Sequence, residues 1–242
     1  MASFIGQLHA KLDVLTYMLE VLTLTRDTLS ERSWIMENAE KVQPSSIRKS
    51  GYHHGDLRAG LIEATRQLVE EKGPDGFSVS DACRLAGVST AAPYKHFKDK
   101  TEMLVATVMQ GMARHRENML AALDGIPEGT PARVTALGEE YVNFALREPG
   151  IFQLKFGGYT DRLEDPSLRE AGEGTFTIVL REVAACLGET DITPEVRRRG
   201  FVLWGFVHGL SFLLADPKLT EMGGEFELKP MLEDVSRRVL KD

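Results

Sequence analysis

The chain has 242 residues, 43% of them hydrophobic, which is enough to bury one or two cores. Its formal net charge of −7, taken alone, argues against a nucleic-acid partner, so the distribution of charge along the chain has to be considered. No run of β-branched residues alternates with polar residues over the length of a strand, so an all-α fold is expected. Cys83 and Cys186 fall on apolar helical faces, so we expect buried reduced thiols instead of a disulfide, and a cytoplasmic location.

Residues 1–50 are predicted to form an amphipathic helix followed by a polar linker. Leucines recur from Leu8 to Leu29 at spacings that place them on one helical face. Asp13 and Glu20 interrupt this apolar run and no basic segment precedes it, so neither a signal peptide nor a membrane span is expected. The helix could pack on the body or on a partner, or act as a regulatory or oligomerising arm. Alternatively, the true start of the protein is Met36.

A basic arm and a scaffold helix are expected next. Tyr52 and His53 follow Arg48, and a flexible arm of this kind can reach a phosphate or a minor groove, although His53 suits an exposed loop equally well. No further metal ligands stand at a usable spacing, so no metal site is expected. Asp56 should cap a helix that runs to about residue 72. Residues 48–101 hold nine Lys and Arg against seven Asp and Glu, so the excess of acid lies elsewhere in the chain.

Two short helices joined by a tight turn are predicted from Ser78 onward. Ser78 and Asp81 have the spacing of a reciprocal N-cap, and Gly87 should end the first helix in a left-handed conformation. Ser89 is expected to cap a second helix over residues 90–97, where Pro93 should be tolerated in the first turn. Small residues followed by cationic ones would let this second helix approach phosphates closely, which is the helix-turn-helix pattern.

This stretch resembles the DNA-binding domain of the TetR/AcrR family of bacterial transcriptional regulators. The resemblance covers about residues 51–104 and is carried by Gly87-Val88-Ser89, Tyr94, His96, Phe97 and Lys100. Pro93 departs from it, because many members carry an aliphatic residue there. The resemblance implies DNA contacts from Thr90, Ala91, Ala92, Tyr94, Lys95, His96 and Lys100, with Tyr52 and His53 on the arm. For Tyr94 and His96 the alternative is packing beneath the helix.

The second half of the chain is expected to be a helical bundle. Apolar periodicity predicts helices over about residues 101–123, 131–147, 151–156, 167–187, 194–215 and 229–241. Trp204, His208 and Gly209 resemble the Trp-x-x-x-His-Gly stretch of the WHG subgroup of the same family. That resemblance implies a homodimer through the two C-terminal helices. The final helix would offer Met231, Leu232, Val235, Val239 and Leu240 to it.

Large side chains of the second half could build a pocket for a flat or greasy effector. The candidates are Met109, Met112, Tyr141, Phe144, Phe152, Phe156, Phe176, Trp204 and His208. For each of them the alternative is an ordinary core position. A lone histidine on an apolar helix, such as His208, is more often a hydrogen-bonded core residue than a ligand contact.

Motifs of enzymes and cofactor sites do not occur: the chain has no P-loop, Gly-x-Ser-x-Gly, Cys-x-x-Cys or His-Glu-x-x-His. We therefore expect no cofactor and no catalytic residues.

The prediction is a regulator with an N-terminal segment over residues 1–50, a helix-turn-helix domain over 51–100 and a helical effector-binding and dimerisation domain over 101–242. It would be a repressor that a small hydrophobic effector releases from a double-stranded DNA operator, with no membrane partner. One alternative is a helical protein that binds lipid-like ligands but not DNA; another is a small helical enzyme that uses His208.

Overall fold

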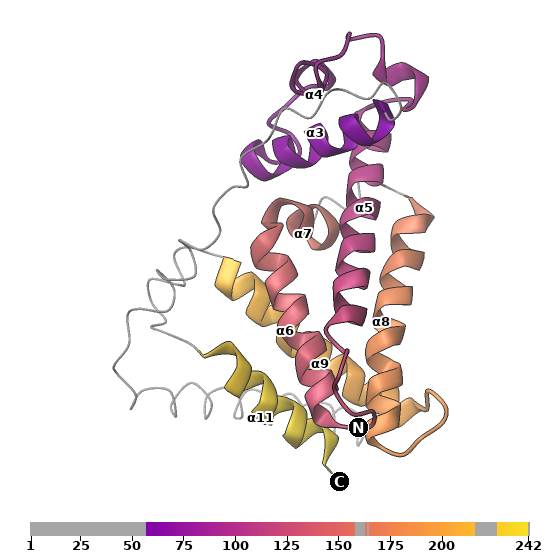
Figure 1. Ribbon diagram of the computed structural model, residues 1–242, viewed down its shortest axis with the longest axis vertical. Helices are drawn as coiled ribbons and strands as arrows, with labels where there is room; N and C mark the ends of the chain where they lie inside the picture. Colours follow the sequence, from indigo (N-terminus) through magenta and orange to yellow (C-terminus); the bar gives the residue numbers. More distant parts are fainter. Residues whose placement is uncertain (1–56, 158–162, 164, 216–226, 242) are drawn as a thin grey trace, which may run out of the picture. The chain divides into compact units, whose positions relative to one another are not determined.

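The computed structural model describes residues 57–157, 163, 165–215 and 227–241, and every regular element within them is helical (Figure 1). The elements are α3 (Leu57–Lys72), α4 (Val79–Ala86), the 3₁₀ turn η2 (Pro93–Lys95), α5 (Lys100–Ala121), α6 (Pro131–Arg147), α7 (Pro149–Phe156), α8 (Pro166–Cys186), α9 (Pro194–Ala215) and α11 (Leu228–Leu240). This confirms the all-α prediction. The predicted N-terminal helix, the linker, the arm with Tyr52 and His53, and the Asp56 cap lie outside the described residues. None of the described helices is long and apolar enough to cross a bilayer.

The caps of α4 form as the sequence predicts. The Ser78 hydroxyl accepts a hydrogen bond from the amide of Asp81, and the Asp81 carboxylate accepts one from the amide of Ser78. Gly87 ends the helix in the left-handed region, with φ 69° and ψ 31°. The amide of Val88 then bonds back to the carbonyl of Cys83, which satisfies one of the last carbonyls of the helix. The turn after α4 is therefore set by local sequence.

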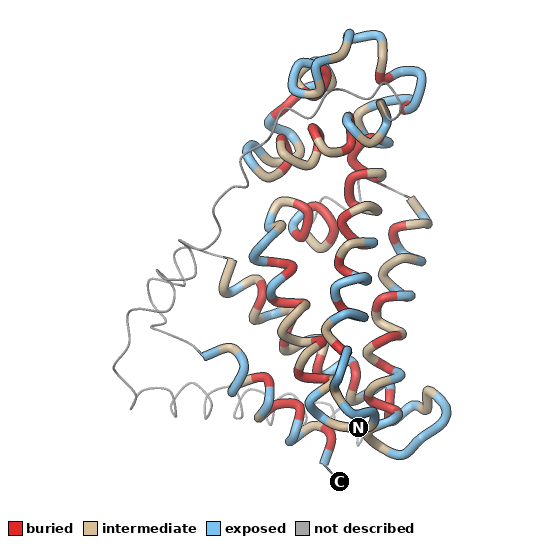
Figure 2. The backbone as a smooth tube through the Cα atoms, in the orientation of Figure 1, coloured by how far each residue is buried: buried red, intermediate tan, exposed pale blue. Residues whose placement is uncertain are grey.

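Phe77 and Phe97 anchor α4 and the turn after it to α3 and to the start of α5. Both rings are buried, and they belong to one continuous core that reaches Phe144 and Phe152 of the helical body. Figure 2 shows the buried positions of α3 and α5 on the sides that face their neighbours, whereas the turn region is largely exposed. The two predicted domains thus share a core, because α3 contacts both α5 and α7.

A carboxylate of α3 caps the first turn of α7. Glu70 accepts hydrogen bonds from the amides of Gly150 and Ile151, with N–O distances of 2.7 and 3.1 Å. Glu148, the residue that precedes α7, makes no side-chain cap itself. Its carboxylate instead accepts two hydrogen bonds from the Arg114 guanidinium of α5. Position 150 requires glycine, because an added Cβ would lie 2.9 Å from the Val69 carbonyl oxygen.

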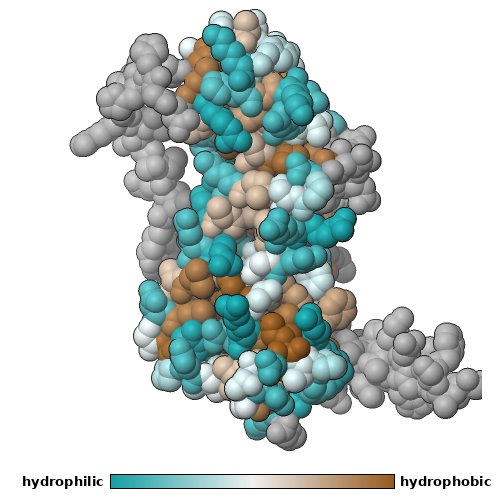
Figure 3. Space-filling view, turned by 90° about the vertical axis from the view of Figure 1, so that its right-hand side faces the viewer, coloured by the Kyte–Doolittle hydropathy of each residue, from teal (hydrophilic) through white to brown (hydrophobic). Residues whose placement is uncertain are grey.

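The body is built around α6, which contacts α5, α7, α8, α9 and α11 (Figure 1). Leu232, Val235 and Leu240 of α11 are buried within the chain, where α11 packs on α6 and α9. These three side chains are thus engaged within the chain, whereas Met231 and Val239 are half-buried. The dimer through the two C-terminal helices stays a prediction. The face in Figure 3 is mainly hydrophilic, with apolar patches in both halves of the view.

Replacing Glu70 by Ala leaves two amides of α7 without an acceptor and should lower the free energy of unfolding by about 1–2 kcal/mol. Chemical denaturation at neutral pH measures the loss. The matched control is Glu71→Ala, the exposed neighbour on the same helix, which should change little. Equal effects of the two substitutions would contradict the capping role.

The pH dependence of a Glu70→Gln variant tests the same carboxylate. Burial raises the pKa of Glu70, and the two amide hydrogen bonds lower it by less than that. A raised pKa in the folded state means that stability is lost as pH rises through that pKa. The stability difference between wild type and the glutamine variant should therefore shrink as pH rises from about 4 to 7.

Candidate DNA-binding surface and ligand cavity

The segment predicted as a second short helix, residues 90–97, is not α-helical. The amide of Ala92 bonds to the carbonyl of Ser89, and a single 3₁₀ turn follows over Pro93–Lys95. The reason is Pro93. In an α-helix capped by Ser89, the first helical hydrogen bond would run from the amide of residue 93 to the carbonyl of Ser89. Proline has no amide hydrogen for that bond, so the chain tightens into i→i+3 turns.

The tightened turn still presents the predicted DNA-contact residues outward. Thr90, Ala91, Tyr94, Lys95 and His96 are exposed, and the Tyr94 side chain has 63% of its surface accessible. Ala92 is half-buried, while Pro93 and Phe97 are buried and hold the turn to the core. Packing beneath the turn, the alternative for Tyr94 and His96, is therefore excluded. The structure brings small, aromatic and cationic side chains together on one short surface loop.

Lys100 is positioned differently from the other cations. Its ammonium donates to the carbonyl of Phe77 at 2.5 Å and lies 4.2 Å from the centre of the Phe77 ring. Burial lowers the pKa of Lys100. Asp99 caps α5 by accepting from the amide of Glu102, so the helix begins one residue earlier than predicted. Lys100 thus links the start of α5 to the segment before α4, and a phosphate contact from it remains a prediction.

A cavity of about 280 Å³ lies among α5, α6, α7, α8 and α9. Five of the predicted pocket residues line it: Met112, Tyr141, Phe156, Phe176 and Trp204. The other four, Met109, Phe144, Phe152 and His208, are not part of its lining. Phe144 and Phe152 are fully buried core residues, with ring centres 6.3 Å apart. Large apolar residues recur on several faces of each helix, and only the packing shows which face borders the cavity. An effector contact from these four residues stays a prediction that the lining of this cavity does not support.

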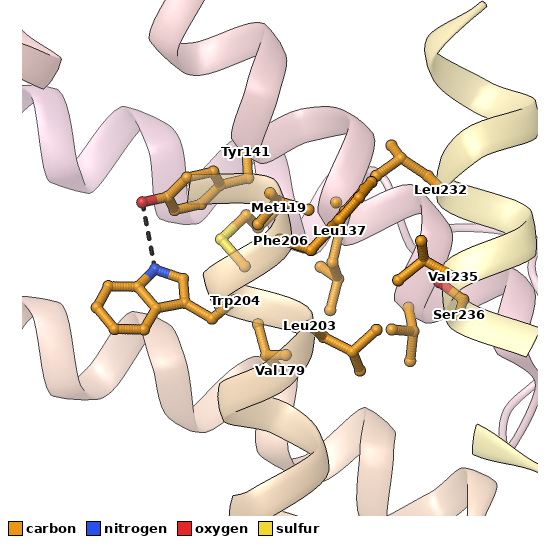
Figure 4. A pocket seen from close by; sticks show the side chains of 13 residues that line it. Met119, Leu137, Tyr141, Val179, Leu203, Trp204, Phe206, Leu232, Val235 and Ser236 are labelled. Carbon is orange, nitrogen blue, oxygen red and sulfur yellow. Dashed lines mark hydrogen bonds between the residues drawn. The ribbon is translucent and has the colours of Figure 1, made fainter. Parts of the chain in front are cut away.

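A hydrogen-bonded group of aromatic side chains stands at the cavity wall. The Tyr141 hydroxyl lies 2.8 Å from Nδ1 of His208 and accepts a hydrogen bond from Nε1 of Trp204 at 3.3 Å (Figure 4). Burial raises the pKa of Tyr141 and lowers that of His208, so both groups are neutral at pH 7. His208 is therefore hydrogen-bonded and half-buried, and whether it also contacts an effector stays a prediction. Tyr141 and Trp204 also line a second, smaller cavity of about 40 Å³, which is bordered by Leu232, Val235 and Ser236 of α11 as well (Figure 4).

Sequence reasoning missed the polar side chains of the larger cavity. They are His115, Lys155, Arg169, Glu173 and Thr175. His115 and Lys155 are buried, and the Lys155 ammonium donates to the carbonyl of Leu168 at 2.6 Å. Burial lowers the pKa of Lys155. The only signal in the sequence was their position among predicted apolar residues: His115 lies three residues after Met112, and Lys155 lies three after Phe152.

Comparison with known proteins agrees with this architecture. The family description "Bacterial regulatory proteins, tetR family" matches residues 61–107, and "Tetracyclin repressor-like, C-terminal domain" matches residues 134–236. The HTH-type transcriptional regulator BetI of Escherichia coli O127:H6 is 33% identical over 76 residues, which are 31% of this chain and 39% of that protein. The match therefore spans well under half of the length of this relative.

Two solved structures show the fold over most of their length. A protein of unknown function from Rhodococcus sp. RHA1 has a TM-score of 0.63 and 28% identity, covering 79% of this chain and 97% of that one. A TetR/AcrR regulator from Thermobifida fusca YX-ER1 has a TM-score of 0.56 and 22% identity, covering 77% and 97%.

The fold and the exposed turn define a helix-turn-helix protein with a helical C-terminal domain. With both halves matched in order, the chain belongs to the TetR family of transcriptional regulators. This agrees with the expectation that it is not an enzyme. The WHG subgroup remains a prediction, since the matching C-terminal description is the tetracyclin repressor-like one.

Replacing Tyr141 by Phe should lower the free energy of unfolding by about 1–3 kcal/mol, because Nδ1 of His208 and Nε1 of Trp204 lose their partner in a buried site. Thermal or chemical unfolding measures the change. Tyr94→Phe removes the same hydroxyl from an exposed ring and should stay within about 0.5 kcal/mol of wild type. A loss of similar size in both variants would show that the buried hydroxyl has no special role.

Proposed function

We propose that the protein regulates transcription by binding duplex DNA through the loop of residues 90–96 and by responding to a small ligand in the 280 Å³ cavity. The observation that carries this proposal is the exposed loop itself. Tyr94, Lys95 and His96 project from a turn whose geometry is fixed by the buried Pro93 and Phe97. Such a loop is suited to a major groove, where side chains meet phosphates and base edges.

The loop would read DNA mainly through shape and close approach. Lys95, His96 and the Tyr94 hydroxyl can donate to phosphate oxygens, whereas Thr90 and Ala91 are small enough to meet base edges. The loop has no Arg or Asn for a bidentate base contact. Specificity would then depend on DNA shape and on the spacing of two half-sites, about 34–36 Å apart on one face of the duplex.

A dimer would supply those two half-sites, and α9 offers a surface for it. Phe201, Gly205, Gly209 and Leu213 recur every four residues and are all exposed. The accessible fractions are 62% for Phe201 and 44% for Leu213. A Cβ added at Gly205 or Gly209 would meet no atom within 4 Å. The surface of α9 between Phe201 and Leu213 is therefore shallow, and no other part of the chain that the structure describes covers it at these two glycines. Ridges at four-residue spacing interdigitate when two helices pack.

Two helices connect the cavity to the DNA-binding loop and could transmit the effect of a bound ligand to it. One is α5, which begins beside the loop and carries Met112 and His115 into the cavity wall. The other is α7, whose residues Lys155 and Phe156 line the cavity and whose first turn is capped by Glu70 of α3. A ligand that favours one arrangement of these helices would change DNA affinity 5- to 150-fold with a coupling of about 1–3 kcal/mol.

Replacing Lys95 by Ala should weaken DNA binding about equally for all sequences and lower the salt dependence, the slope of log K against log salt, by about one, since one phosphate contact is lost. Mobility-shift titrations with DNA from beside the gene, at two salt concentrations, measure both. Lys229→Ala on α11 removes an exposed cation far along the chain from the loop and is the matched control. Absence of any salt-dependent DNA binding by the wild type would instead favour a ligand-binding protein that does not bind DNA.

Replacing Leu213 by Glu should dissociate the dimer, because each new carboxylate would be buried against the apolar face of the partner's α9 without a counter-charge. We expect the dimer dissociation constant, measured by analytical ultracentrifugation, to rise at least about 100-fold, with operator affinity falling in parallel. Leu146→Glu on α6 alters a leucine of nearly equal exposure, 46%, and should leave the dimer intact. Dimerisation unaffected by Leu213→Glu would show that α9 is not the interface.

A further inference from the structure

The wall of the 280 Å³ cavity contains a buried polar side chain, His115, for which the described residues provide no hydrogen-bond partner. It projects from α5, and only 1% of its surface is accessible. Neither ring nitrogen has a hydrogen-bond partner among the described residues. The imidazole is held in place by its faces and edges, stacked 4.5 Å from the Phe144 ring and packed edge-on against Tyr141. A buried polar group without a partner is costly, so a native structure that keeps one calls for an explanation.

The charges around His115 determine which of its nitrogens is available. Nδ1 lies 3.8 Å from a carboxylate oxygen of Glu140, too far for a hydrogen bond but close enough for the carboxylate to favour a hydrogen on Nδ1. Arg147 donates two hydrogen bonds to the same carboxylate. Burial raises the pKa of Glu140, but His115 and Arg147 lower it by more, so the group is ionised at neutral pH. In a neutral imidazole that carries its hydrogen on Nδ1, Nε2 is a hydrogen-bond acceptor.

The remaining lining limits the size and character of a ligand. Phe156, Phe176 and Trp204 give the cavity aromatic walls, and Met112 and Met119 add polarisable sulfur. The hydroxyls of Thr175 and Tyr141 are already engaged, with the carbonyl of Ala171 and with His208. An apolar cavity of about 150 Å³ is known to bind benzene, so 280 Å³ suits a compound of about two rings.

We infer that the cavity binds a neutral aromatic compound of about two fused rings that carries one N–H or O–H group, which donates a hydrogen bond to Nε2 of His115. This deepens the proposed function, since it names the class of ligand for the same cavity. Flat rings would pack between Phe156, Phe176 and Trp204, and the donor would give His115 the partner that the described residues do not provide. The Glu140 carboxylate near His115 disfavours an anionic ligand group beside this ring, whereas the cationic side chains of the lining, Lys155 and Arg169, stand on α7 and α8.

The test uses two probes of nearly equal size and shape. Indole carries an N–H donor, whereas benzofuran replaces it with an oxygen that cannot donate. Isothermal titration calorimetry on the full chain without DNA should show indole binding about 5- to 10-fold more tightly than benzofuran, the effect of one buried neutral hydrogen bond. Indole-2-carboxylate adds an anion and should bind more weakly than indole.

Variants connect the preference to His115. His115→Phe should remove the difference between indole and benzofuran while retaining benzofuran binding, and His115→Gln, which keeps an acceptor, should restore part of it. Thr107→Val changes another buried polar residue of α5 that does not line the cavity, and should keep the preference. Equal affinity of wild type for both probes, tighter binding of the carboxylate, a preference that survives His115→Phe, or no binding of any probe would each overturn the inference.

A parallel mobility-shift assay without probe separates this inference from the proposed function. A chain that shifts DNA but binds none of the probes would refute only the ligand class. A chain that binds indole with the expected preference but never shifts DNA would refute the regulatory role and leave the ligand class standing.

Discussion

The joint between the DNA-binding region and the body depends on one carboxylate placed at one helix terminus. The first amides of α7 have no acceptor in their own helix, and Glu70 of α3 supplies it. This close approach is possible only because residue 150 is glycine. The contact joins α3 to α7, and the core that runs from Phe77 to Phe144 continues across it. The helices beside the loop and the helices around the cavity therefore form one packed body.

Features determined by neighbouring residues could be predicted from the sequence. The reciprocal cap of Ser78 and Asp81, the left-handed Gly87 and the helices of the body were all predicted within a few residues. The second helix of the helix-turn-helix was the exception. Proline is tolerated in a first helical turn, but Pro93 occupies the position whose amide would make the first helical hydrogen bond. A proline one residue earlier would lie within the first turn, where no helical hydrogen bond needs its amide, so one position separates an α-helix from a 3₁₀ turn.

Features that depend on packing could be predicted only in part. The aromatic residues of the body look alike in sequence, yet Phe156 and Phe176 border the cavity and Phe144 and Phe152 are interior. Similarly, the apolar residues of α11 suit a dimer interface as well as an intramolecular contact, and the buried ones make the second. The polar cavity residues were missed because His115 and Lys155 carry no motif. Their burial is set by elements far away in sequence.

Pro93 also affects how the loop meets a partner. Its ring fixes one backbone angle before any contact is made, and Pro93 itself is buried against the core. A loop with fewer accessible conformations loses less entropy when a surface immobilises it. The same restriction limits how far the loop can adapt to an imperfect site. The loop is therefore rigid and adapts poorly to altered DNA sites. It should discriminate against mismatched DNA sequences more strongly than a flexible loop would.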